Sequence, residues 1–256
     1  MRIWIDAGHG GNDPGACAQG RREKDCTLQV CVELAKLLNS YGISVGQTRS
    51  TDTYVDVDKR ASLSNRWGAD YFVSVHLNAG GGSGLETYCS IIGTRSRKLA
   101  EQVQRALLRL GYHDRGVKTK TGTDGRDYYA VIRETTAPAI LIELGFIDSP
   151  NDMRRFDPTH AARLIATGIL AAVGKDAPVI SDTTQDITLV QGASYHVKLT
   201  SPVKPAFTVG NGAVLQTITG RQSGNDYIFG VRAIGKSGQS TGVYANGKLL
   251  FGVLIK

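Results

Sequence analysis

Apolar and polar positions along residues 1–175 follow a pattern that predicts strands and helices in turn. Short apolar runs predict strands at residues 2–6, 43–48, 71–76, 85–92 and 139–143. Apolar residues at helical spacing predict helices near residues 26–40, 56–67, 96–110 and 158–173, and residues 111–138 are expected to be irregular. Such alternation is typical of a mostly parallel twisted sheet flanked by helices, so the predicted fold class is α/β.

The pattern changes after residues 174–178, and no helical period is found from Ser181 onward. Short β-prone runs are instead separated by turns rich in Gly, Asn and Ser, including Asn211-Gly212 and Asn246-Gly247. The chain is therefore expected to have an α/β domain at residues 1–175, a linker at 176–180 and a smaller, C-terminal all-β domain at 181–256.

The chain carries a formal net charge of +7. Residues 1–180 contribute 23 − 20 = +3 and residues 181–256 contribute 7 − 3 = +4, so the smaller domain is the more basic per residue. This charge suits attachment to a polyanion, and it equally suits a solvated basic surface. Nucleic acid is not an expected partner, because the sequence lacks a motif that combines aromatic and basic residues.

Four cysteines, Cys17, Cys26, Cys31 and Cys89, form no Cys-x-x-Cys pair. Free thiols are expected, since a chain of this size needs no disulfides to be stable, and an oxidised pair stays open as the alternative. Residues 1–6 read as a strand and not as a signal peptide, and no apolar run approaches the roughly 18 residues of a membrane span. We therefore expect a protein made in the cytoplasm without a signal peptide and not inserted into a membrane.

Three segments place polar side chains where an apolar run ends: residues 6–11, 74–78 and 140–146. They carry His9, His76 and Glu143, and strand ends are where open α/β sheets build sites. With Glu23, these are the residue types of a catalytic zinc centre. Taken alone, Glu23 also suits a solvated charge at a helix start. Glu143 follows four apolar residues, so it needs a metal, a water or an arginine nearby.

Four motifs together resemble the zinc-dependent N-acetylmuramoyl-L-alanine amidases of the Amidase_3 type. They are Asp6-Ala7-Gly8-His9-Gly10-Gly11, Glu23-Lys24-Asp25, Ser74-Val75-His76-Leu77-Asn78 and the segment 138–147. The resemblance covers residues 1–175, which it implies to be a zinc amidase catalytic domain around a six-stranded sheet. It further implies that His9, Glu23 and His76 bind Zn²⁺ and that Glu143 assists catalysis.

The implied reaction is hydrolysis of the amide bond between N-acetylmuramic acid and L-alanine in peptidoglycan, with lysis of the wall. A zinc peptidase that cuts within the peptide stem would use similar ligands, and a cysteine amidase using Cys17 is a further alternative. Residues 112–127 are expected to contribute to the substrate groove. Arg60, Asn65 and Arg133 are polar candidates near the site without an assigned role.

The all-β domain resembles the C-terminal domains of some endolysins and amidases of clostridia and their phages, through residues 207–212 and 242–247. This implies an endolysin of a clostridial phage or prophage that acts at the bacterial cell wall, although a bacterial autolysin would look alike. The domain is expected to bind the wall, through a wall polymer or otherwise, and self-association is left open. Six aromatic residues are assigned to its core in preference to a carbohydrate-stacking face: Tyr195, Phe207, Tyr227, Phe229, Tyr244 and Phe251.

Overall fold

The computed structural model describes residues 1–175, 179–201, 204–223 and 226–256. The chain divides into two compact units, Met1–Asp176 and Ala177–Lys256, each with hydrophobic clusters of its own. The predicted linker at residues 176–180 lies partly outside the described residues. The first strand of the second unit, β9, spans Ile180–Ser181.

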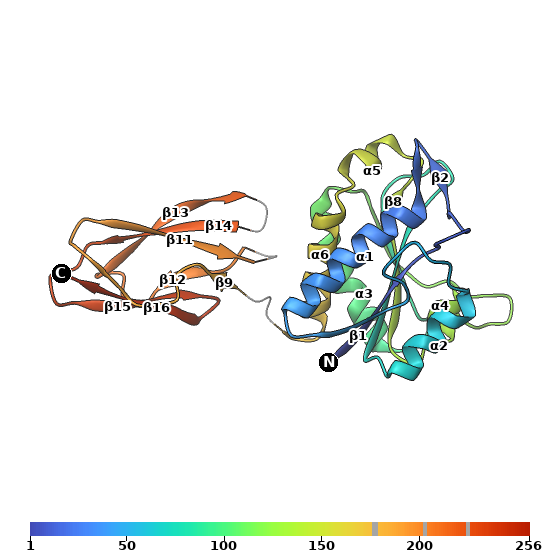
Figure 1. Cartoon of the computed structure of the whole chain (residues 1–256), viewed down its shortest axis with the longest axis horizontal. Coiled ribbons are helices and arrows are strands. Elements are labelled where there is room, and N and C mark those ends of the chain that lie inside the picture. Colours follow the sequence, from blue (N-terminus) through green and yellow to red (C-terminus); the bar gives the residue numbers. More distant parts are fainter. Residues whose placement is uncertain (176–178, 202–203, 224–225) are drawn as a thin grey trace. The chain divides into compact units, whose positions relative to one another are not determined.

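The first unit is built on a six-stranded sheet (Figure 1). In spatial order its strands are β4 (Ser44–Gln47), β1 (Arg2–Ala7), β5 (Tyr71–Asn78), β8 (Ala139–Phe146), β6 (Leu85–Cys89) and β7 (Asp114–Lys118). The first four run parallel, β6 is antiparallel to β8, and β7 is parallel to β6. The predicted α/β class with a mostly parallel sheet is confirmed, as is the implied number of strands.

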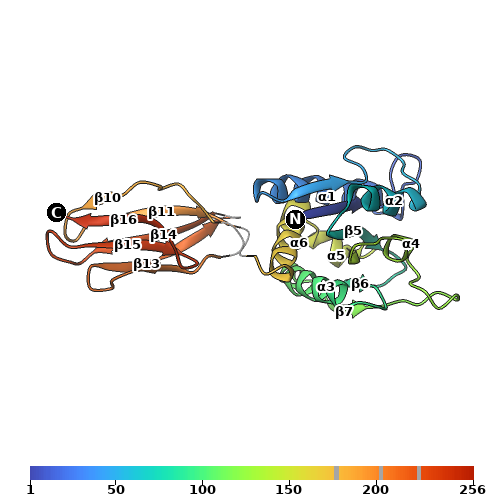
Figure 2. The ribbon, with the colours of Figure 1, turned by 90° about the horizontal axis from the view of Figure 1, so that it is seen from below.

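Helices cover both faces of this sheet. Figure 1 shows α1 and α6 on one side and α2 and α4 on the other, and Figure 2 shows α3 beside β6 and β7. The helices are α1 (Glu23–Ser40), α2 (Val57–Trp67), α3 (Thr94–Leu107), α4 (Ala130–Arg133), α5 (Pro150–Arg155) and α6 (Pro158–Ala172), with a 3-10 turn, η1, at Leu108–Leu110. Because both faces are covered, β1 and β8 are apolar almost throughout, and Glu143 is the least buried position of β8.

Local signals in the sequence explain where two of these helices begin and end. The side chain of Asp56 accepts a hydrogen bond from the backbone N–H of Asp58 and so caps α2, which stops at Gly68 in the left-handed conformation (φ 72°). Asp157 caps α6 in the same way, and Pro158 occupies the first turn of that helix.

The structure corrects the prediction that residues 111–138 are irregular, because this segment contains β7 and α4. β7 is an edge strand with half-exposed charged side chains and a glycine, so it lacks the apolar alternation that marks other strands. α1 begins at Glu23, three residues before the predicted start, after a hairpin of β2 (Cys17–Ala18) and β3 (Arg21–Arg22). Glu23 is buried there, so the alternative that it is a solvated charge at a helix start is wrong.

The second unit consists of two four-stranded sheets around one apolar cluster, which confirms the all-β prediction. One sheet holds β10 (Ile187–Leu189), β16 (Lys248–Ile255), β15 (Ser240–Ala245) and β12 (Phe207–Val209). The other holds β13 (Leu215–Ser223), β14 (Asp226–Ala233), β11 (Ser194–Thr200) and β9. The hairpin of β15 and β16 turns at Asn246-Gly247, where both residues have positive φ.

Five of the six aromatic residues assigned to the core of this unit belong to its apolar cluster or pack against it: Tyr195, Phe207, Tyr227, Phe229 and Phe251. Tyr244 is different, since it is half-buried and lines a surface depression between β15 and β10. The core assignment is therefore confirmed for five residues and not for Tyr244.

All four cysteines are free, as predicted, and only Cys17 is exposed. Among the described residues, no helix combines the length and the apolar character needed to cross a membrane.

The packing of α1 on the sheet yields a first prediction. Leu34 is fully buried on this helix, so Leu34→Ala should lower the free energy of unfolding by about 2–5 kcal/mol through lost burial and the cavity left behind. Lys36→Ala, two residues away on the exposed side of the same helix, should change it by less than about 0.5 kcal/mol. Urea unfolding of both variants measures the difference, and equal effects would contradict the packing described.

Candidate metal centre and active site

Three side chains from different parts of the chain meet at one edge of the sheet: His9 beyond the end of β1, Glu23 at the first position of α1, and His76 on β5. β1 and β5 are parallel neighbours, so their carboxyl ends meet at the same edge. One ligand atom from each of the three lies within 4.8 Å of those of the other two. The structure thus brings together all three residues that the sequence predicts to bind metal.

The carboxylate of Glu23 is the centre of this cluster. Its Oε1 lies 3.1 Å from Nε2 of His9 and 3.0 Å from Nδ1 of His76. Backbone N–H groups hold it in place, since Leu77 donates to Oε1 and Ala16 donates to Oε2, each at 3.0 Å. The carboxylate is therefore fixed by the chain before it meets any ligand.

Two glycines allow the backbone to approach the side chains of His9, Glu23 and His76 closely. A Cβ on Gly8 would lie 2.3 Å from Cε1 of His76, and a Cβ on Gly15 would lie 2.6 Å from the His9 ring and 2.7 Å from Oε2 of Glu23. His9 itself has a positive φ of 61°, a conformation that non-glycine residues rarely adopt. The Gly-rich turn therefore serves close approach of the backbone to the imidazole and carboxylate groups.

A second carboxylate orients His9. Oδ2 of Asp13 lies 2.8 Å from Nδ1 of His9, while Nε2 of the same ring faces Glu23. A carboxylate on the far nitrogen of a metal-binding histidine fixes its tautomer and raises its basicity. Asp13 was not predicted from the sequence, although its place four residues after His9 in a tight turn is a signal that could have found it.

The electrostatics of the cluster suit a cation. Burial alone would raise the pKa of Glu23, but hydrogen bonds with His76 and His9 more than offset this and hold that pKa far below its usual range. Burial alone would lower the pKa of His9, and the nearby carboxylates of Glu23 and Asp13 raise it instead. Two imidazoles and an ionised carboxylate form a donor set that zinc prefers in catalytic sites.

Glu143 stands beside this cluster, opposite His76 in the register of β5 and β8. It lines a pocket of about 240 Å³ together with His9, His76 and Tyr129. Its Oε2 is buried and, within the part of the chain that the structure describes, has no hydrogen-bond partner. Burial raises the pKa of Glu143 to about 7, because ionisation is costly there; the nearby charge of His76 opposes this rise and that of Glu23 adds to it.

The three polar candidates near the site have different positions. Arg60 on α2 lines the pocket and donates from Nη1 to Oδ1 of Asp6 at 2.9 Å and from Nη2 to the carbonyl of His9 at 2.9 Å. Asn65 and Arg133 instead bind backbone groups of residues 127–136, so they hold the loop around α4. Arg60 is therefore the one of the three that supports the cluster directly.

Two alternatives from the sequence find no support in the geometry. Across the described residues, no arginine forms a hydrogen bond or ion pair with Glu143, so the pairing considered for it is not found. The Sγ atom of Cys17 donates to the carbonyl of Gly15 and, in the described ranges, forms no hydrogen bond with a histidine. His113, His160 and His196 lie outside the cluster.

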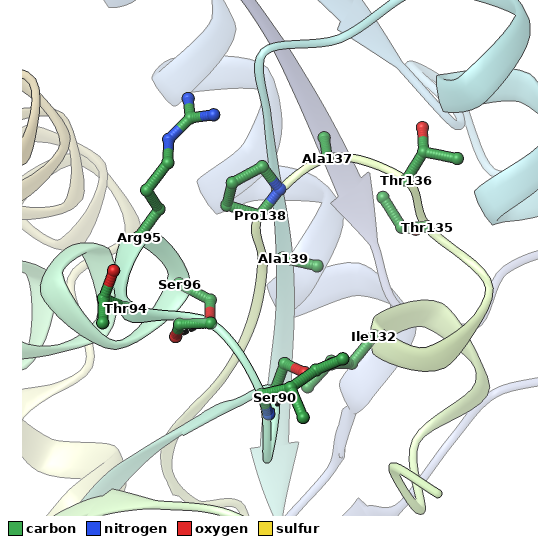
Figure 3. Close-up of a pocket in the computed structure, with 12 residues that line it drawn as sticks. Ser90, Thr94, Arg95, Ser96, Ile132, Thr135, Thr136, Ala137, Pro138 and Ala139 are labelled. Atoms are coloured by element: carbon green, nitrogen blue, oxygen red, sulfur yellow. Dashed lines mark hydrogen bonds between the residues drawn. The ribbon is translucent and has the colours of Figure 1, made fainter.

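A larger pocket, of about 450 Å³, lies away from this cluster, between the start of α3 and the start of β8 (Figure 3). Figure 3 shows Thr94, Arg95 and Ser96 on one side and the segment from Thr135 to Ala139 on the other. Its lining holds no acid, histidine or cysteine, so it lacks the groups for hydrolytic chemistry. The smaller pocket at Glu143 is the better candidate for the active site.

Comparison with known proteins agrees with the geometry of this site. The family model Amidase_3, described as N-acetylmuramoyl-L-alanine amidase, matches residues 3–175. The chain belongs to this family. The match confirms the family predicted from the four motifs, and it places all four residues of the candidate site within the amidase-like part.

Three relatives illustrate the similarity. The N-acetylmuramoyl-L-alanine amidase CwlM of Bacillus licheniformis is 40% identical over 66% of this chain and 65% of its own length. The endolysin of Bacillus phage SPP1 is 37% identical over 59% of this chain and 56% of its own. The crystal structure of an N-acetylmuramoyl-L-alanine amidase from Clostridium difficile 630 is 36% identical, covers 67% of this chain and 94% of its own, and has a TM-score of 0.59. The chain thus spans less than two thirds of the length of both Bacillus-related proteins.

Glu143 gives a prediction for the stability of the metal-free amidase domain. Its pKa of about 7 in the folded protein exceeds the ordinary 4.5, so folding favours the neutral carboxyl. That stabilisation is present below about pH 4.5 and is lost as the pH rises toward 7. Relative to Glu143→Gln, which stays neutral, the wild type should lose up to about 3 kcal/mol of unfolding free energy over this range. Urea unfolding from pH 4 to 8 measures it.

The matched control for this titration is Glu101→Gln on α3, whose half-exposed carboxylate pairs with Arg97. This variant should differ from the wild type by less than about 1 kcal/mol throughout this pH range, because an exposed ion pair contributes little to stability. A difference between wild type and Glu143→Gln that does not change with pH would contradict the described burial.

Arg60 gives a third prediction. Arg60→Ala removes the charged partner of Asp6, which is fully buried, and frees carbonyl oxygens in the turn that carries His9. The free energy of unfolding should fall by about 3–5 kcal/mol, as expected for a broken buried ion pair. Arg66→Ala, an exposed arginine on the same helix, should have little effect. Thermal unfolding compares the two, and a small effect of Arg60→Ala would show that Asp6 is satisfied by Ser74 alone.

Proposed function

We propose that the chain is a zinc-dependent N-acetylmuramoyl-L-alanine amidase that hydrolyses the bond between the lactyl group of N-acetylmuramic acid and L-alanine in bacterial peptidoglycan. One observation carries this proposal: His9, Glu23 and His76 converge beside Glu143, whose buried Oε2 has no partner among the described residues. A carboxylate in this position is costly unless it takes part in proton transfer or ligand binding.

The three ligands fit zinc in a catalytic role. Two imidazoles and one carboxylate leave a position open for substrate or water, as in known zinc hydrolases. Bound there, the ion would supply Lewis-acid chemistry, which polarises the scissile carbonyl and acidifies water. Asp13, Leu77 and Ala16 keep the ligand atoms in place through the contacts described above.

Glu143 acts as the general base and then as the general acid. Its carboxylate takes a proton from the attacking water and passes it to the amine of L-alanine as that group leaves. A pKa near neutrality suits both halves of this transfer, since the group can accept and release a proton at similar cost. Arg60 contributes by holding the backbone of the turn that bears His9.

The biological setting belongs to the same proposal. The chain is an endolysin that degrades the cell wall, in line with its similarity to the endolysin of a Bacillus phage. A clostridial phage or prophage as its source, and synthesis in the host cytoplasm, stay predictions. Residues 1–175 act as the catalytic domain and residues 181–256 attach it to the wall, for which the charge of +4 in the smaller domain is the main support. Self-association through the smaller domain also stays a prediction.

A digestion of purified cell walls tests the activity. Protein loaded with zinc should release peptides with a new N-terminal L-alanine, identified by mass spectrometry, and a chelator should abolish the release. Glu143→Gln should lower the rate by at least about 100-fold while zinc binding is retained, because it removes only the proton transfer. His76→Ala should lose zinc, whereas His113→Ala, which changes an exposed histidine outside the cluster, should keep it.

Three outcomes would overturn this proposal. New termini farther along the stem would identify a zinc peptidase. Digestion that resists the chelator and stops on thiol alkylation would identify Cys17 as the nucleophile. Full activity of Glu143→Gln would show that another group moves the proton.

A further inference from the structure

A row of polar side chains crosses the sheet from the metal cluster to the edge strand β7. Residues directly opposite each other in a sheet point to the same face, and His76 lies opposite Glu143, which lies opposite Glu86 on β6. Glu86 in turn contacts two cations from β7: Arg115 donates from Nε at 2.7 Å and Lys118 from Nζ at 2.5 Å, both to Oε2. The row therefore joins the proposed proton-transfer group to a pair of positive charges.

The charges at the outer end of this row do not cancel. Glu86 is almost fully buried and brings one negative charge, while Arg115 and Lys118 bring two positive charges and are about one-third exposed. Asp114, the nearest acidic neighbour in sequence, is turned toward Gln104 on α3 and accepts a hydrogen bond from it. One positive charge is thus left over at this end of the row, on side chains that are partly exposed to solvent.

Both cations also have N–H donors that are not used within the described part of the protein. In the described residues, Nη2 of Arg115 forms no hydrogen bond. The ammonium group of Lys118 has three N–H donors and uses only one of them. The guanidinium of Arg115 lies 5.0 Å from the centre of the Phe146 ring, which restricts its motion. A third cation, Lys120, lies 3.7 Å above the ring of Tyr128 and 5.7 Å from that of Tyr129, which lines the pocket. We call Arg115, Lys118 and Lys120 the cationic strip.

The distance from the pocket fits a peptide that starts there. Neighbouring strands lie about 4.8 Å apart, so β7 is about 10 Å from β8. An extended chain advances about 3.3–3.6 Å per residue, so a carboxylate on the second or third residue of a stem reaches about this far from the bond to be cut. Glu86 and the aromatic rings already hold the side chains of the strip in place, so little conformational entropy is lost when an anion binds.

We infer that the cationic strip binds a free carboxylate of the peptide stem and so sets the stem preference of the enzyme. This inference rests on the proposed function, because it assumes that the stem extends from the pocket after the lactyl bond. It also gives a specific role to residues 112–127, which the sequence predicts to line the groove. Arg115 and Lys118 bind the charged group of the stem, and Glu86 is the positioning residue that presents them.

The test uses soluble muropeptides whose second and third stem residues carry either free or amidated carboxylates, with zinc-loaded full-length protein. The wild type should have a lower KM for the free form at one of the two positions, which identifies the carboxylate bound. Arg115→Gln and Lys118→Gln should each raise that KM about tenfold, as expected for loss of one partly exposed charge-assisted contact, with kcat nearly unchanged. For the stem amidated at that position, neither variant should change KM.

Two kinds of control separate charge recognition from structural damage. Lys118→Arg keeps the charge and should keep the preference. Arg97→Gln removes a more exposed charge from α3, outside the strip, and should leave both KM values as in the wild type. KM values for the free form should also rise with ionic strength in the wild type and less so in Lys118→Gln.

The failures can be told apart. A wild type that cleaves free and amidated stems with equal KM, or variants whose KM rises equally for both, would overturn the strip as a carboxylate site while leaving the amidase activity intact. A fall in kcat alone would mean that the strip only supports Glu86 and Glu143. If the zinc-loaded wild type cleaves none of the muropeptides at the lactyl bond, the proposed function is wrong and the inference falls with it.

Discussion

The carboxylate of Glu23 is the interaction on which the amidase-like unit depends. It joins the first turn of α1 to the carboxyl ends of β1 and β5 through two imidazoles and two backbone N–H groups. A buried carboxylate with so many donors is stabilised in its charged form, and the same donors leave it only one geometry. The position of α1 against the sheet and the geometry of the candidate metal ligands are therefore two results of one set of contacts.

Much of this was accessible from the sequence, for identifiable reasons. The strands that carry the site lie inside the sheet and are buried on both faces, so their apolar runs are continuous. His76 and Glu143 interrupt two of these runs, and His9 follows shortly after the third. The order of the four motifs then identified the family, which the comparison confirms. Glu23 was harder to assign, because an acidic residue at a helix start is common and only its burial distinguishes it.

Other features depend on contacts that no local pattern records. Asp13 acts through a hydrogen bond whose partner is set by the shape of the turn, and Arg60 reaches Asp6 from 54 residues away. β7 lies at the sheet edge, where one row of backbone groups is unpaired and charged residues are favoured, so its sequence resembles a loop. The cluster around Glu86 follows from strand order, since β6 precedes β8 in sequence but lies between β8 and β7 in the sheet.

The hydrogen bonds of Arg60 bear on the order in which the site assembles. The turn with His9 has carbonyl groups that point inward and find their donors on α2, a helix that forms only from residues much later in the chain. The N-terminal segment by itself cannot hold its imidazole in the ligand geometry. The sheet and α2 must therefore pack together before His9, Glu23 and His76 take up the arrangement seen in the structure.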